Sequence, residues 1–148
     1  MSDTFQLLIQ GFEFDLWANK RWLAYLDGKS ELVQDQAIFA HIFSGQEVWR
    51  QRVLGSPPTE MPRFEVSERA IIELSEGWRE LLRSRTDNPI IHYHRFDGEP
   101  GHLHLDQIAR HLIDHGTYHR GELRGLCRSR NDEDFPETGL GLYYMSQK

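Results

Sequence analysis

Apolar residues recur every three or four positions along four long stretches of the chain, which is the spacing that places side chains on one face of an α-helix. These stretches cover about 4–26, 33–54, 67–83 and 106–130. Segments rich in glycine, proline, asparagine or aspartate separate them, and such residues favour turns. Asp3 and Ser67 are placed to cap the first and third helices. The pattern predicts an all-α protein, a four-helix bundle.

The hydrophobic period changes between the third and fourth of these helices. Residues 90–96 and 101–105 alternate more nearly as strands do, and they flank turn-forming residues at 97–100. Two short runs on either side of such a turn favour a β-hairpin. We therefore expect a short hairpin or extended connection before the last long helix.

The end of the chain carries a further apolar segment after Pro136. We expect a short final helix there, with Leu140, Tyr143 and Tyr144 packing back onto the other helices. No internal repeat, low-complexity tract or shift in composition marks a boundary within the chain. The sequence therefore predicts a single domain over residues 1–148.

Composition restricts the class of protein. Of the 148 residues, 39% are hydrophobic and 27% are charged, which is typical of a globular protein. No apolar run approaches the roughly 18 residues needed to cross a bilayer, and the N-terminal residues do not resemble a secretory signal. The single cysteine, Cys127, has no partner for an internal disulfide. We expect a cytoplasmic protein with no membrane partner and an inert, packed thiol at Cys127.

The net charge argues against a nucleic-acid partner. The chain carries 23 acidic and 17 basic residues, a formal charge of −6, and a negative protein repels phosphate unless its basic residues are concentrated on one face. Arginines gather only between Arg120 and Arg130, and the acidic residues 132–134 follow them directly. We therefore predict no role in nucleic-acid binding.

Histidines are the unusual feature of this chain. Five of the eight lie between His102 and His119. At about 100° per residue on the fourth helix, His119 falls inside the apolar face, His115 falls at its border and His111 falls outside it. Two imidazoles four positions apart project together, which suits chelation of one metal ion. The alternative is that each ring is satisfied by a carbonyl group or a buried water molecule.

His41 on the second helix is the candidate third ligand, because it lies at the core border of that helix, next to the apolar position Ile42. Three imidazoles from two helices leave a coordination position open, as in catalytic rather than structural zinc sites. Glu122 is close to His115 around the helix axis. It is a candidate catalytic base, a group that orients a ligand histidine, or a surface partner of an arginine.

A rival metal site involves the histidines of the predicted hairpin. His92 and His94 share one face of the first run, as His102 and His104 share one face of the second. Folding at the turn could place the two pairs opposite each other, although solvent-exposed histidines in a polar hairpin need no ion. Three tryptophans, Trp17, Trp22 and Trp49, are expected in the core or a pocket wall, or else at an interface.

Several segments of the sequence resemble the DinB-like (YfiT-like) four-helix-bundle proteins, which are distinct from the DNA polymerase of similar name. The strongest is HLIDHGTYHRGE at 111–122, and LWAN at 16–19, HIFSGQEVW at 41–49 and FPET at 135–138 agree with it. The resemblance departs from the common pattern at Asp114, Glu122 and Gly139, where Asn, Gln and Asp are frequent. These differences leave the histidines intact but put any particular substrate in doubt.

The resemblance implies a homodimeric bundle with a divalent metal ion, such as nickel or zinc, held by His41, His115 and His119. Some relatives of this kind are transferases or isomerases that use a low-molecular-weight thiol. The resemblance thus favours a metal-dependent thiol S-transferase or related enzyme, which would take a small-molecule thiol and an electrophile. The alternatives are a non-catalytic, metal-stabilised dimer that acts in a stress response, and a metal-free bundle whose core histidines are satisfied by carbonyl groups or buried water.

Overall fold

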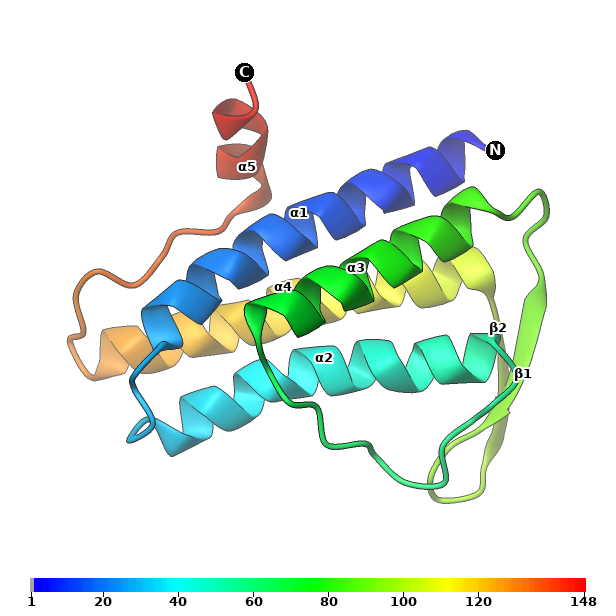
Figure 1. The fold of residues 1–148 in the computed structure, drawn as a ribbon, viewed down its shortest axis with the longest axis horizontal. Helices are drawn as coiled ribbons and strands as arrows, with labels where there is room; N and C mark the ends of the chain where they lie inside the picture. The colour runs from blue at the N-terminus through cyan, green and yellow to red at the C-terminus, as the bar shows by residue number, and fades with distance from the viewer. Residues whose placement is uncertain (1) are drawn as a thin grey trace.

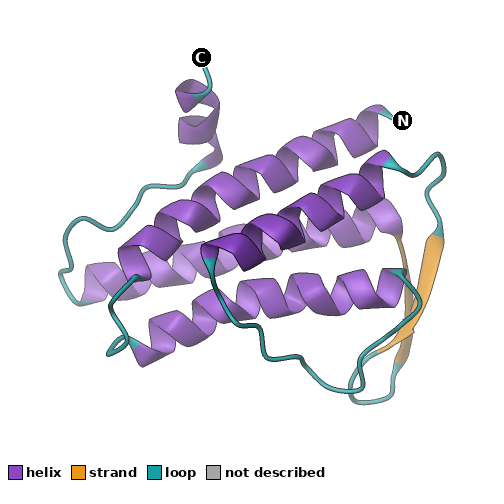
Figure 2. Cartoon of the chain, in the orientation of Figure 1, coloured by secondary structure: helices purple, strands orange, loops and turns teal. Residues whose placement is uncertain are grey.

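The computed structural model describes residues 2–148. Its elements in chain order are α1 (Asp3–Leu26), α2 (Val33–Val53), α3 (Glu68–Arg83), β1 (Ile90–His94), β2 (Pro100–His104), α4 (Leu105–Ser129) and α5 (Leu140–Ser146). The protein is therefore mostly helical, with one small sheet of two strands (Figure 2). The predicted helical class is confirmed, and the four long helices match their expected ranges to within two residues at each end.

The four long helices lie alongside one another, with α1 packed against α3 and α4, and α2 packed against α4 and α3 (Figure 1). The β1–β2 hairpin lies at one end of these helices, and α5 stands apart on the side of α1. This arrangement brings α2 and α4, which are distant in the sequence, side by side along their length. None of the helices within residues 2–148 combines the length and the apolarity needed to cross a membrane.

The helix ends follow from capping side chains and from glycines. The hydroxyl oxygen of Ser2 accepts a hydrogen bond from the Phe5 amide at 3.1 Å, so Ser2 caps α1 and the prediction of Asp3 was wrong by one residue. Ser67 caps α3 as expected, accepting from the Ala70 amide at 3.1 Å. After α2, the chain turns at Gly55 with φ of 83°, a left-handed conformation that only glycine adopts without strain.

The core fills the space between the long helices. Phe12 of α1 stacks on Trp78 of α3 with ring centroids 5.5 Å apart, and both side chains are fully buried. The indole N–H of Trp78 donates to the carbonyl oxygen of Gln46 at 3.2 Å, so the polar end of this large side chain is satisfied. This packing fixes α1 and α3 against α2, close to the segment of α2 that carries His41.

The hairpin prediction is confirmed, with β1 and β2 antiparallel and His92 opposite His102. Alternate residues face inward, as the period of two requires. Tyr93 on the inner face contacts Trp49 of α2, with ring centroids 4.7 Å apart. The inner face therefore fixes the hairpin against α2.

The final helix packs less closely than the sequence suggested. Tyr143 contacts Phe14 and Trp17 of α1 at ring-centroid distances of 5.6 and 5.4 Å. Leu140 and Tyr144, by contrast, are 45% and 52% exposed. The prediction that all three side chains pack back on the helices was therefore wrong for two of them, because a helix of seven residues presents only one narrow face to α1.

Candidate metal centre

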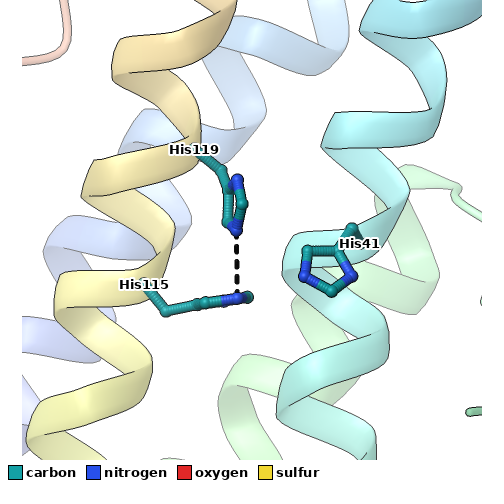
Figure 3. Close-up of side chains that lie close together, drawn as sticks. All are labelled: His41, His115 and His119. Atoms are coloured by element: carbon teal, nitrogen blue, oxygen red, sulfur yellow. Dashed lines mark hydrogen bonds between the residues drawn. The ribbon is translucent and has the colours of Figure 1, made fainter.

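His41 on α2 faces His115 and His119 on α4 (Figure 3). The ring centroid of His41 lies 5.0 Å from that of His115 and 4.9 Å from that of His119. Each of the three histidines offers one ring nitrogen, and these nitrogens lie within 4.8 Å of one another. Among residues 2–148, these three form the one group of three or more side chains with such a spacing. The structure thus brings together the three histidines that the sequence selected.

The two α4 histidines meet through their Nε2 atoms, which are 3.1 Å apart. At that separation one ring must donate to the other, unless a cation lies between their lone pairs. The opposite nitrogen of His119, Nδ1, contacts the carboxylate of Glu122. A carboxylate on the far nitrogen fixes the tautomer and the orientation of a ligand histidine. Nε2 of His119 is therefore the atom available to a metal ion.

The electrostatic environment keeps His41 and His115 in the neutral imidazole form that binds metals. Burial, reinforced by the nearby His119, His41 and His111, lowers the pKa of His115 to about 4. Burial also lowers the pKa of His41, with a further contribution from His119. Both groups therefore have available lone pairs at neutral pH, because protonating either one would place a cation in a desolvated site beside other imidazoles.

Gly45, one helical turn from His41, allows the His115 ring to lie against α2. A Cβ atom at this position would lie 3.2 Å from Cε1 and 3.5 Å from Nδ1 of His115. The first distance is tighter than ordinary van der Waals contact, so a larger residue would force the ring to shift. The absence of a side chain at position 45 therefore contributes to the position of His115.

The residues present fit a divalent metal ion. Nδ1 of His115 is buried and has no hydrogen-bond partner within residues 2–148, although buried polar atoms are nearly always paired. Protein atoms alone therefore leave one ring nitrogen of this group without a partner. Three imidazoles are a suitable donor set for zinc, nickel, copper or iron. The three histidines are therefore able to hold a metal ion, and their ligand type does not determine which metal it is.

The remaining histidines do not join this group. His111 lies one turn before His115, with ring centroids 5.5 Å apart, but it is not among the three side chains whose ring nitrogens lie within 4.8 Å of one another. In the hairpin, only His92 and His102 are opposite each other, whereas His94 pairs with Pro100 and His104 pairs with Ile90. The register therefore separates the two pairs that the rival four-histidine site required.

The other candidate side chains have clear positions. Glu122 contacts His119, and no arginine pairs with it within the described part of the chain. Cys127 is fully buried beside the Tyr25 hydroxyl, and burial raises the pKa of its thiol, as expected of an inert packed cysteine. Trp22 is buried in the core, Trp49 lines the cavity, and Trp17 is half-buried against Tyr143.

A cavity of about 360 Å³ adjoins the histidines. His41, Gly45 and Trp49 of α2 form one wall, and His111 and His115 of α4 form another. Arg52 of α2 and the hairpin turn close the far end. Pockets that bind small molecules commonly combine apolar side chains, which here are Val48, Trp49, Met61 and Phe96, with a few polar groups. Two of the three candidate ligands, His41 and His115, therefore border a space into which a small molecule can fit.

A buried polar network supports the α4 segment behind the histidines, and the sequence analysis missed it. The Arg120 guanidinium donates to Oδ1 of Asp15 at 2.6 Å and to Oδ1 of Asn19 at 2.8 Å. Gln46 of α2 donates to Oδ2 of Asp15 at 2.9 Å. All four side chains are buried. The network joins α1, α2 and α4 at the residue that follows His119, so it fixes the backbone that carries this histidine.

Comparisons with known proteins agree with this geometry. The DinB family matches residues 17–130, a range that contains His41, His115, His119 and Glu122. Neither the comparison with curated proteins nor the comparison with solved structures yielded a match. The family match covers more than half of the chain and confirms the resemblance seen in the sequence. The chain belongs to the DinB family.

Proposed function

We propose that this protein is a metal-dependent thiol S-transferase or a related enzyme, built on a four-helix bundle formed by α1 to α4. His41, His115 and His119 would hold a divalent ion, nickel or zinc, and a low-molecular-weight thiol would be the co-substrate. The observation that supports this proposal is the convergence of three imidazoles from two helices beside a cavity. Family membership is consistent with it.

The number of ligands favours catalysis over a purely structural role. Structural zinc sites usually have four protein ligands, whereas catalytic sites keep one position for water or substrate. A bound divalent ion supplies a Lewis acid, which lowers the pKa of a thiol or water molecule in its open position. His41 and His115 both border the cavity. A small molecule in the cavity is therefore next to the side chains that would hold the ion.

The protein's own residues prepare this site in two ways. Glu122 contacts Nδ1 of His119 and so directs Nε2 toward the other histidines. Burial keeps His115 neutral at physiological pH. In this proposal Glu122 orients a ligand. A role as catalytic base would need it to reach substrate, and its observed contact is with His119.

The test is turnover of a thiol and an electrophile by protein loaded with nickel or zinc. Glutathione and chlorodinitrobenzene are a suitable first pair. The double variant His115→Ala/His119→Ala should lose metal and activity together. The control is His92→Ala/His94→Ala, which removes two histidines from the exposed face of the hairpin and should retain both. Equal turnover in the native protein and the His115/His119 variant would refute the proposal.

A second candidate function follows from the origin of the ligands. Because they come from both α2 and α4, a bound ion would cross-link two helices, and a ligand that binds only the native state stabilises it. The protein would then be a non-catalytic, metal-stabilised homodimer that acts in a stress response. Under this alternative, a chelator lowers the melting temperature, added metal restores it, and no combination of thiol and electrophile is turned over.

A further inference from the structure

Arg52 lies at the end of the cavity opposite the histidines. It is eleven positions after His41 on α2, which is close to three full helical turns, so the two side chains project from the same face. The rise of about 1.5 Å per residue separates their Cα atoms by roughly 16 Å. Both side chains line the same cavity. A molecule with one end at the histidines can therefore extend toward Arg52.

The Arg52 guanidinium is held in place by aromatic rings. Its central carbon lies 4.6 Å from the ring centroid of Trp49, 5.0 Å from that of Tyr93 and 5.3 Å from that of Phe96. One of its NH₂ groups donates to the carbonyl oxygen of His94 at 3.2 Å. These contacts already restrict the Arg52 side chain in the free protein. The side chain therefore loses little conformational entropy when a ligand binds, and such preorganisation favours recognition of a ligand.

The charge of Arg52 has no acidic partner in the described part of the chain. Within residues 2–148, no carboxylate lies within ion-pair distance of Arg52, although its side chain is partly buried. The nearby Arg95 pairs with Asp97 at 2.7 Å, and both of these residues also line the cavity. Arg95 and Asp97 offset each other, which leaves Arg52 as the unneutralised cation at this end. A partly desolvated guanidinium without a counter-ion is suited to bind a carboxylate.

We propose that Arg52 binds a carboxylate of the thiol co-substrate, whose sulfur reaches the three histidines at the other end of the cavity. This inference rests on the proposed function, which places a thiol at the metal site. It adds a substrate class, namely carboxylate-bearing thiols that are long enough to extend along the cavity. It also identifies Arg52 as a residue that determines specificity. A carboxylate on the electrophile would not be required, because the molecule that spans the cavity is the one bound at the histidines.

The test compares two thiols of equal length that differ only at the far end, ω-mercaptohexanoate and ω-mercaptohexanol. Binding to the nickel-loaded protein is measured by calorimetry, and thiol ligation is measured independently by the thiolate-to-nickel charge-transfer band. A hydrogen-bonded charge pair supports a preference for the carboxylate of about ten- to a hundredfold. Arg52→Gln should remove this preference, whereas Arg52→Lys should retain part of it because Lys keeps the charge without the planar fork.

Two controls separate recognition from a structural role. The affinity for mercaptohexanol should be the same in the native protein and in Arg52→Gln, since a displaced hairpin would weaken both thiols. Arg69→Gln removes an exposed arginine that pairs with Glu73 on α3, and it should change neither affinity. A charge-transfer band with no carboxylate preference, or a preference that survives in Arg52→Gln, overturns this inference and leaves the proposed function intact. Absence of the band with both thiols overturns the proposed function itself.

Discussion

The carboxylate of Glu122 contacts Nδ1 of His119, on the opposite side of the ring from the nitrogen that faces His115. The two residues are one helical turn apart on α4, so the contact is set by the helix and needs no distant element. Side chains that hold a ligand histidine in this way contribute to metal affinity because they fix the tautomer and raise the basicity of the ring.

Removal of the Glu122 carboxylate should weaken metal binding. We expect Glu122→Ala to lower the affinity for zinc or nickel by about 10- to 100-fold, measured by competition with a chromogenic chelator. Glu122→Gln should lose less metal affinity, because the amide oxygen still accepts a hydrogen bond from Nδ1 of His119. Glu73→Ala, which removes an exposed carboxylate from α3, is the control and should have no effect. Unchanged affinity with loss of turnover in Glu122→Ala would instead indicate a catalytic base.

Gly45→Ala should affect the metal site more than the fold. The new Cβ would lie 3.2 Å from Cε1 of His115, so the ring must move and metal affinity should fall. Alanine is favoured over glycine inside a helix by about 1 kcal/mol, which offsets part of the steric cost in the free energy of unfolding. The matched control is Gly125→Ala in α4, where a Cβ would meet no atom within 4 Å.

Gly125→Ala should stabilise the protein by up to about 1 kcal/mol and leave metal affinity unchanged. Chemical denaturation of the metal-free variants and chelator competition give the two quantities separately. A Gly45→Ala protein that binds metal as tightly as the native chain would show that the His115 ring is not constrained by α2.

Most of the secondary structure was predictable because it depends on local patterns. The apolar period of three to four residues located the long helices, and the turn at 97–100 located the hairpin. The pairing of His115 and His119 also follows from a local rule, the i, i+4 spacing of a helix. His41 could be selected because it borders the apolar face of its own helix. That its ring faces the other two histidines required the packing of α2 on α4.

The buried network could not be derived in the same way. Arg120 lies in the arginine-rich stretch 120–130, which the sequence offered only as a candidate basic face. Its partner Asp15 is 105 positions away, and nothing local marks the two as a pair. The one available signal was Asn19, a polar residue within the apolar face of the first helix. Polar residues in such positions are rarely buried without partners, so Asn19 indicated that a polar partner was needed there.

Arg120→Met should therefore destabilise the protein strongly. It would leave the buried Asp15 carboxylate without its cationic partner, and loss of one member of a buried ion pair costs about 3–5 kcal/mol. Urea denaturation of the metal-free protein measures this change. Arg69→Met breaks an ion pair whose side chains are 90% and 62% exposed, and such pairs contribute at most about 1 kcal/mol. Similar losses of unfolding free energy in the two variants would show that Arg120 and Asp15 do not interact as the structure indicates.

Acid should destabilise the metal-free protein through the histidines of the cavity. Burial lowers the pKa values of His41 and His111, and burial with neighbouring imidazoles lowers that of His115 to about 4. Below the unfolded-state value of about 6.5, the unfolded chain therefore binds more protons than the native chain, so the free energy of unfolding falls as the pH decreases toward about 4. Melting temperatures of chelator-treated protein should fall over this range.

The fall in melting temperature should be smaller in His115→Gln and the same as in the native protein in His94→Gln, which alters an exposed hairpin residue. A native protein whose melting temperature is constant down to about pH 5 would contradict the assignment of these rings as buried and neutral.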